Sequence, residues 1–142
     1  MAVIIIFGYV KMGKSTLGRY LNSSISNSIL LDADEMREDL YYKGFTDEDR
    51  TKWMHMLSNL AARFEKQGVL PIIAMVAPIR KVRLECMRKF IKPIQIFVDG
   101  TTEYMWKDSY FEKPTEEDDV IVYRKPDTYD NIIIGIMEKI NG

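Results

Sequence analysis

The sequence predicts a three-layer α/β sandwich, in which helices cover both faces of a mostly parallel, five-stranded sheet. Two observations predict this fold class. Short apolar runs alternate with helical patterns along the whole chain, and this order is typical of parallel strands joined by crossover helices. The first apolar run leads into a glycine-containing loop and then a helix, which is the beginning of a strand–loop–helix unit.

The expected strands are apolar runs rich in β-branched residues. In chain order they are residues 2–7, 28–32, 69–76, 94–98 and 119–122. Helical patterns fill the segments between and after them, at residues 14–22, 34–42, 47–67, 79–90, 101–107 and 128–141. No repeat, low-complexity tract or linker interrupts the chain, so we expect one domain over residues 1–142.

The helix at residues 47–67 has the clearest signals. Thr46 followed by the acidic Asp47 and Asp49 resembles a capping box, with acidic charge in the first turn. Its apolar stripe at helical spacing consists of Trp53, Met56, Leu57, Leu60, Ala61 and Phe64. We interpret this stripe as core packing, and Gly68 as the residue that stops the helix.

The other helices are supported by their apolar faces or their first turns. The helix at 14–22 has an apolar face made of Leu17, Tyr20 and Leu21. Pro78 suits the first turn of the helix at 79–90. Asp127 and Asp130 mark the start of the last helix, whose apolar side is made of Ile132, Ile133, Ile136, Met137 and Ile140.

Residues 8–15, Gly-Tyr-Val-Lys-Met-Gly-Lys-Ser, match the phosphate-binding loop pattern G-x-x-x-x-G-K-[ST] without a mismatch. Glycines let the backbone curl so that successive N–H groups point into one concavity, and the following helix adds its positive end. The loop therefore predicts binding of ATP or a similar triphosphate, in a P-loop nucleoside triphosphate hydrolase-type sandwich. The expected phosphate contacts are Gly8, Lys11, Met12, Gly13, Lys14, Ser15 and Thr16, with Ser15 holding Mg²⁺.

Two carboxylates and an arginine follow the second strand, where ligands of such sheets lie. Asp34 can accept the proton of an attacking hydroxyl or orient Mg²⁺, and Arg37 can bind an anionic group. Alternatively, Asp32 or Asp34 caps the next helix. Beside a phosphate-binding loop we favour the functional role for Asp34.

Other polar residues near strand ends are less informative. Arg80 and Arg83 lie one turn apart and could face substrate, although a solvated helix face is the default. The connection from Asp99 to Pro114 could form a short lid with Lys107, or an ordinary surface loop. His55 has no cysteine or second histidine near it in sequence, which argues against a zinc site.

Bulk composition excludes several classes of protein. A net charge of −1 without a long basic run gives no attraction to nucleic acid. The single cysteine, Cys86, excludes an internal disulfide; we expect helix packing there, with a reactive thiol as the alternative. No stretch reaches the length of a membrane span and no signal peptide is evident, so a cytoplasmic protein is expected.

Several blocks in order make the chain resemble the adenylylsulfate kinases, P-loop kinases that phosphorylate the 3′-hydroxyl of adenosine 5′-phosphosulfate with MgATP. Residues 31–37, Leu-Asp-Ala-Asp-Glu-Met-Arg, are similar to the family's L-D-G-D-x-x-R. Residues 44–50, Gly-Phe-Thr-Asp-Glu-Asp-Arg, are similar to G-F-S-x-x-D-R. Residues 77–83 are similar to S-P-x-R-x-x-R, and residues 111–114 to Y-E-x-P.

The resemblance implies a role for each matching residue. Lys14 and Ser15 would handle the ATP phosphates and Mg²⁺, and Asp34 would be the carboxylate near the acceptor hydroxyl. Arg37 and Arg50 would bind the anionic groups of the acceptor. Phe45 would stack on its base, which agrees with the general use of aromatic side chains as base platforms.

The chain departs from the family pattern around the acceptor. Trp53 stands where the family usually has asparagine, and His55 replaces the last arginine of the same block. Ala77 replaces a serine, and the family's lid pattern R-D-x-K-G-L-Y is reduced to Lys107-Asp108. We count Trp53 among the expected acceptor-binding residues.

The leading hypothesis is a kinase that transfers the γ-phosphoryl group of ATP to a hydroxyl of a nucleotide-like acceptor, with adenosine 5′-phosphosulfate as the best-supported one. Another acceptor, such as cytidine diphosphoramidate, is the alternative within this class. From a different class, the chain could be an NTP-binding switch module. The family often forms dimers, so a homodimer is possible.

Overall fold

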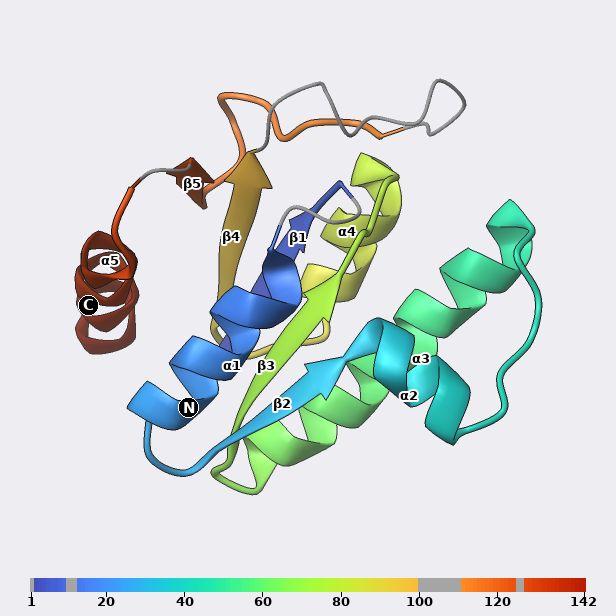
Figure 1. Cartoon of the computed structure of the whole chain (residues 1–142), viewed down its shortest axis with the longest axis horizontal. Helices are drawn as coiled ribbons and strands as arrows, with labels where there is room; N and C mark the ends of the chain where they lie inside the picture. Colours follow the sequence, from blue (N-terminus) through green and yellow to red (C-terminus); the bar gives the residue numbers. More distant parts are fainter. Residues whose placement is uncertain (1, 10–12, 100–110, 125–126) are drawn as a thin grey trace.

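The structure is a computed structural model that describes residues 2–9, 13–99, 111–124 and 127–142 (Figure 1). Its elements are β1 (Val3–Gly8), α1 (Lys14–Ser24), β2 (Ser28–Asp32), α2 (Ala33–Asp39), α3 (Asp47–Lys66), β3 (Leu70–Met75), α4 (Arg80–Met87), β4 (Pro93–Asp99), β5 (Val120–Arg124) and α5 (Tyr129–Asn141). The strands form one sheet in the order β2-β3-β1-β4-β5, and every neighbouring pair is parallel. The predicted fold class is confirmed.

The central strand β1 divides the core into two layers. Val3, Ile5 and Phe7 pack against α3 and α4 on one face of the sheet. Ile4 and Ile6 pack against α1 and α5 on the other. A parallel strand covered on both faces has no side that can be polar, which explains the unbroken apolar run at the start of the sequence. Figure 1 shows this arrangement of helices on both sides of the sheet.

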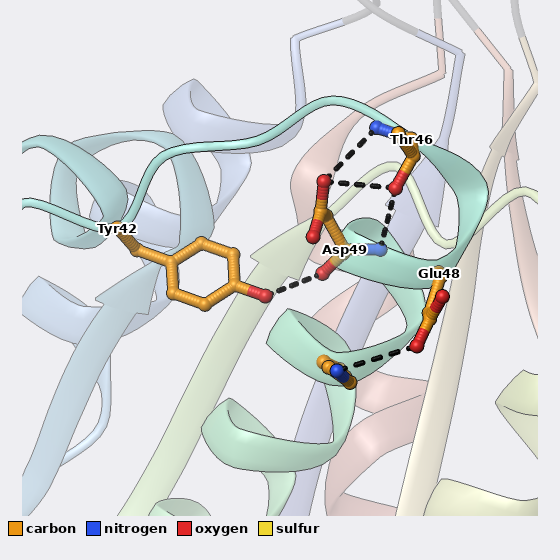
Figure 2. Close-up of polar contacts among 5 residues, drawn as sticks. Tyr42, Thr46, Glu48 and Asp49 are labelled. Carbon is orange, nitrogen blue, oxygen red and sulfur yellow. Dashed lines mark hydrogen bonds and ion pairs between the residues drawn. The ribbon is translucent and has the colours of Figure 1, made fainter.

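The capping box at the start of α3 is confirmed. The Asp49 amide donates to Thr46 Oγ1 (3.1 Å), and the Thr46 amide donates to Asp49 Oδ2 (3.4 Å), as Figure 2 shows. The hydroxyl of Tyr42 donates to the carbonyl oxygen of Asp49 (2.8 Å). These bonds fix the loop between α2 and α3 against the first turn of α3.

The buried face of α3 is shifted from the predicted stripe, most clearly at Met56. Met56 is 50% exposed, whereas the neighbouring Met54 and Ser58 are buried. The buried side includes residues 53, 54, 57, 58 and 61, so it is centred slightly away from Met56. Sequence spacing locates an apolar face to within about one residue, and packing against the sheet decides its centre.

The helices α2 and α4 end earlier than predicted. α2 ends at Asp39, before a turn in which Tyr41 has φ 55°. α4 ends at Met87, although residues up to 90 were expected. The helix expected at 101–107 and Lys107 lie outside the described residues. Across the part of the chain that is described, no helix has both the length and the apolarity to cross a lipid bilayer.

Candidate active site

The phosphate-binding loop begins at the carboxyl end of β1. Gly8 has φ 152° and its amide donates to the carbonyl oxygen of Val76 (3.4 Å). Gly13, with φ 92°, immediately precedes α1, as expected for a loop that leads into a helix N-terminus. Thr16 is exposed on the first turn of α1. The predicted contacts Lys11 and Met12 lie outside the described residues.

Gly8 leaves no room for a side chain. A Cβ atom there would lie 2.6 Å from the carbonyl oxygen of Val98 on β4. We expect Gly8→Ala to lower the free energy of unfolding by about 2–4 kcal/mol, since backbone strain and overpacking add. Gly68→Ala is the matched control, because Gly68 has φ 83° but open space around it, and should cost about 1 kcal/mol. Urea denaturation of the nucleotide-free protein tests this; equal losses would contradict the clash.

Lys14 lies half-buried inside the loop. Its Nζ donates to the carbonyl oxygen of Tyr9. Burial lowers the pKa of Lys14 to about 8, and the nearby carboxylates of Asp34 and Asp32 offset part of this shift. A partly desolvated ammonium is stabilised by an anionic partner, so Lys14 is placed to bind a phosphate, while the two carboxylates beside it favour a cation.

The structure separates the roles of the two carboxylates after β2. Asp32 is buried and caps α2, because its Oδ1 accepts from the amides of Asp34 (3.1 Å) and Glu35 (3.4 Å). Its Oδ2 accepts a hydrogen bond from the Ser15 hydroxyl. Asp34 is exposed, and its carboxylate accepts no hydrogen bond from the described residues. The cap is therefore Asp32, and Asp34 is available to a ligand.

Asp32 belongs to this site although sequence reasoning assigned it no role beyond a possible cap. Its position directly at the end of a strand was the signal that could have found it. Ser15 and Asp32 together offer the oxygen donors that Mg²⁺ prefers. In the described residues no group of three or more His, Cys, Asp or Glu side chains gathers as a metal site.

A cavity of about 400 Å³ lies beside the loop. All five predicted acceptor-binding residues line it, and they are Asp34, Arg37, Phe45, Arg50 and Trp53. Its other walls come from Tyr9, from the segment after β3 and from Phe111. Residues from α2, α3 and four loops thus converge on one space, as expected beyond the carboxyl ends of parallel strands.

Arg37 is held in place before any ligand binds. Its guanidinium lies 4.7 Å from the ring centroid of Phe45 and 5.3 Å from that of Tyr42. It also donates to the carbonyl oxygen of Gly44. The Phe45 ring itself is 75% exposed, so one face remains available for stacking. Arg50 has no side-chain hydrogen bond or ion pair with any described residue.

Trp53 forms part of the cavity wall rather than an exposed contact. It is 5% exposed, and its ring lies 5.1 Å from that of Tyr42. Its indole Nε1 is buried and has no hydrogen-bond partner among the described residues. A bulky indole therefore narrows the cavity at the position where the family pattern has a small amide.

The default interpretation of Arg80 and Arg83 as a solvated helix face is wrong. Arg80 forms a bidentate pair with Asp118 (2.9 and 2.6 Å), and this pair lowers the pKa of Asp118. Arg83 is only 2% exposed. Helical spacing cannot tell a solvated arginine from a buried or paired one here, because the partners Glu112 and Asp118 lie about 30 residues or more further along the chain.

Cys86 and His55 belong to the packing between α3 and α4. Cys86 is buried, and burial raises the pKa of its thiol, which makes it unreactive. His55 Nδ1 accepts from Nζ of Lys89 (2.8 Å). These contacts fit the expectation of helix packing for Cys86.

Comparison with known proteins agrees with this geometry. The sequence profile of the family described as adenylylsulphate kinase matches residues 1–113. An adenylyl-sulfate kinase from Paraburkholderia xenovorans is 38% identical over 82 residues, which cover 54% of this chain and 46% of the relative. A probable adenylyl-sulfate kinase from Archaeoglobus fulgidus is 31% identical over 102 residues, covering 67% and 64%. The match thus spans about half to two thirds of these relatives.

Solved structures show the same fold. The Mycobacterium tuberculosis APS kinase CysC, in complex with AMPPNP and APS, superimposes with a TM-score of 0.80 at 18% identity, covering 99% of this chain and 98% of that one. A sugar kinase from Janibacter sp. gives 0.75 at 17% identity, covering 99% and 95%. The fold is therefore shared by kinases of different kinds, while the sequence profile that matches is that of the adenylylsulphate kinases. This chain belongs to the adenylylsulphate kinase family.

Proposed function

We propose that this protein transfers the γ-phosphoryl group of ATP to a hydroxyl of a nucleotide-like acceptor, and that adenosine 5′-phosphosulfate is this acceptor. The observation that carries the proposal is the cavity beside the phosphate-binding loop. It brings Asp34, two arginines and an exposed aromatic ring together, and the carboxylate of Asp34 also lies close enough to Lys14 to raise its pKa. A hydroxyl, an anionic group and a base on one molecule match these three kinds of side chain.

The donor half of the site is the loop and its two neighbours. The amides of the loop and the Lys14 ammonium would bind the phosphates of ATP and stabilise the charge that develops in transfer. Ser15 and Asp32 would hold Mg²⁺, directly or through water. When bound, Mg²⁺ neutralises charge on the phosphates.

The acceptor half of the site is the cavity. The acceptor hydroxyl oxygen forms a bond to the γ-phosphorus, the bond from that phosphorus to the bridging oxygen breaks, and ADP leaves. The hydroxyl proton passes to the Asp34 carboxylate, which accepts no hydrogen bond from any described residue. Arg37 and Arg50 bind the anionic group of the acceptor, and the free face of Phe45 stacks on its base.

Trp53 supports a second candidate acceptor. Its buried indole forms part of the cavity wall where the family pattern has asparagine, and this exchange favours a smaller base. A cytidine nucleotide, such as cytidine diphosphoramidate, has a smaller base than adenosine. This candidate uses the same donor half and the same Asp34.

Calorimetry and a turnover assay test the proposal together. The protein is saturated with Mg²⁺ and AMPPNP, and is then titrated with adenosine 5′-phosphosulfate and, separately, with cytidine nucleotides. We expect tighter binding of the phosphosulfate, and ADP release from ATP that depends on it. Preference for a cytidine compound would favour the second candidate. ATP binding without phosphorylation of either acceptor would contradict the kinase proposal.

Self-association stays a prediction. A relative is described as a hexameric APS kinase from Thiobacillus denitrificans, of which this chain covers 29%. We propose that this chain forms a homodimer, and sedimentation velocity over a range of concentrations decides it.

A further inference from the structure

The segment at residues 111–118 is fastened to α4 by two arginines of that helix. The partly exposed Arg80 binds this segment through its pair with Asp118, and Asp118 also accepts a hydrogen bond from the amide of Thr115 (2.9 Å). The buried Arg83 binds it through Nη2, which donates to the carbonyl oxygen of Glu112 (2.6 Å). The two anchors lie one helical turn apart.

Arg83 also fixes the segment after β3. Its Nη1 donates to the carbonyl oxygen of Ala77 (2.7 Å). Ala77 is buried and has φ 49°, a left-handed conformation that a residue with a side chain keeps only when its surroundings enforce it. The amide of Glu112 donates to the carbonyl oxygen of Pro78 (2.8 Å), so the two segments are also joined directly.

Aromatic rings surround the Arg83 guanidinium. It lies 4.6 Å from the ring centroid of Phe7 and 5.4 Å from that of Phe111. Phe111 in turn packs against Tyr9, with ring centroids 4.5 Å apart. Burial lowers the pKa of Arg83 to about 10, so the guanidinium stays charged at neutral pH. The guanidinium therefore donates one hydrogen bond to the segment after β3 and another to the segment at residues 111–118, and it keeps both while it is charged.

Both stretches form walls of the acceptor cavity, through Ala77, Pro78 and Phe111. We propose that Arg83 is a positioning residue for the acceptor: it sets the distance between the wall after β3 and the wall at Phe111, and touches neither substrate. The kinetic test of this role rests on the proposed function. Arg83 is a buried cation whose hydrogen bonds go to the backbone carbonyl oxygens of Ala77 and Glu112 and not to a carboxylate.

Arg83→Lys is the decisive variant, because one ammonium keeps the charge but cannot present the planar fork that reaches both carbonyls. We expect the KM for the acceptor to rise by about tenfold, the equivalent of one lost charged hydrogen bond. The kcat and the KM for ATP should stay within about twofold. Partial unfolding would instead lower the apparent kcat and leave both KM values unchanged. Arg88→Lys, at an exposed position just after α4, is the matched control and should change nothing.

Amide hydrogen exchange gives a readout that does not need turnover. In the wild-type protein the Glu112 amide should be protected, and in Arg83→Lys it and residues 76–79 should exchange at least about tenfold faster while β1 does not. Arg83→Gln, which loses the charge and has a shorter side chain than lysine, should exchange at least as fast as Arg83→Lys. Unchanged KM and unchanged exchange in a folded variant, or a fast-exchanging Glu112 in the wild type, would overturn the inference. If the wild type phosphorylates no acceptor, the proposed function fails, and exchange alone still decides the role of Arg83.

Discussion

Asp34→Asn should lower kcat for phosphoryl transfer by about 10²–10⁴-fold, because the amide cannot take the proton of the acceptor hydroxyl. The free energy of unfolding should fall by less than about 1 kcal/mol, since Asp32 and not Asp34 caps α2 and Asp34 acts only through its charge near Lys14 and the first turn of α2. Binding of AMPPNP should stay within about threefold, because the loop amides and Lys14 remain. Steady-state kinetics with both acceptors, together with calorimetry, measures these effects.

Asp39→Asn is the matched control for this prediction. Asp39 is an exposed carboxylate at the end of the same helix and does not line the cavity. Its replacement should leave kcat unchanged. The same experiment separates a kinase from an NTP-binding switch, because a switch would hydrolyse ATP slowly with or without the Asp34 carboxylate. Unaltered ATP turnover in Asp34→Asn would therefore favour the switch.

Lys14→Met should remove detectable binding of AMPPNP and at the same time stabilise the nucleotide-free protein. Burial lowers the pKa of Lys14 from its ordinary value of 10.5 to about 8 in the folded state. Between these values the unfolded chain binds more protons, so the free energy of unfolding rises with pH in this window. Below pH 8 the cost of burying the charge is fully present. Methionine should therefore raise the free energy of unfolding at pH 7 by on the order of 1–3 kcal/mol.

The pH dependence provides the check on this prediction. Urea denaturation at pH 7 and pH 10 should show the gain of Lys14→Met shrinking as the wild-type lysine loses its proton. In the wild type, the Kd for AMPPNP should rise by up to about tenfold between pH 7 and pH 9, as the ammonium is neutralised. Lys14→Arg keeps its charge and should show a flat profile. Equal stabilities of Lys14→Met and wild type at pH 7 would show that burial of this charge costs nothing.

Local chemistry in the sequence was enough to predict the layers of this protein and the place of the strand–loop–helix unit that contains Gly8 and Gly13. A buried parallel strand has to be apolar on both faces, which marks β1, and the loop that follows needs its glycines at fixed positions. At Gly8 a side chain is excluded, since a Cβ atom there would clash with the backbone of β4. The capping box at Thr46 and Asp49 is equally local, and it was predicted correctly.

The tertiary structure decided which of several chemically equivalent side chains does which task. Asp32 and Asp34 are two residues apart, and the direction of the chain at the end of β2 turns one to Ser15 and the α2 amides and leaves the other exposed. Arg80 and Arg83 look like a solvated pair until residues 112 and 118 fold back onto α4. Patterns of neighbouring residues determine helices, strands and a phosphate-binding loop because those depend on contacts within a few residues. The cavity beside the loop also depends on contacts between segments far apart in the chain, such as Phe111 with Tyr9 and Glu112 with Arg83, and these exist only in the folded chain.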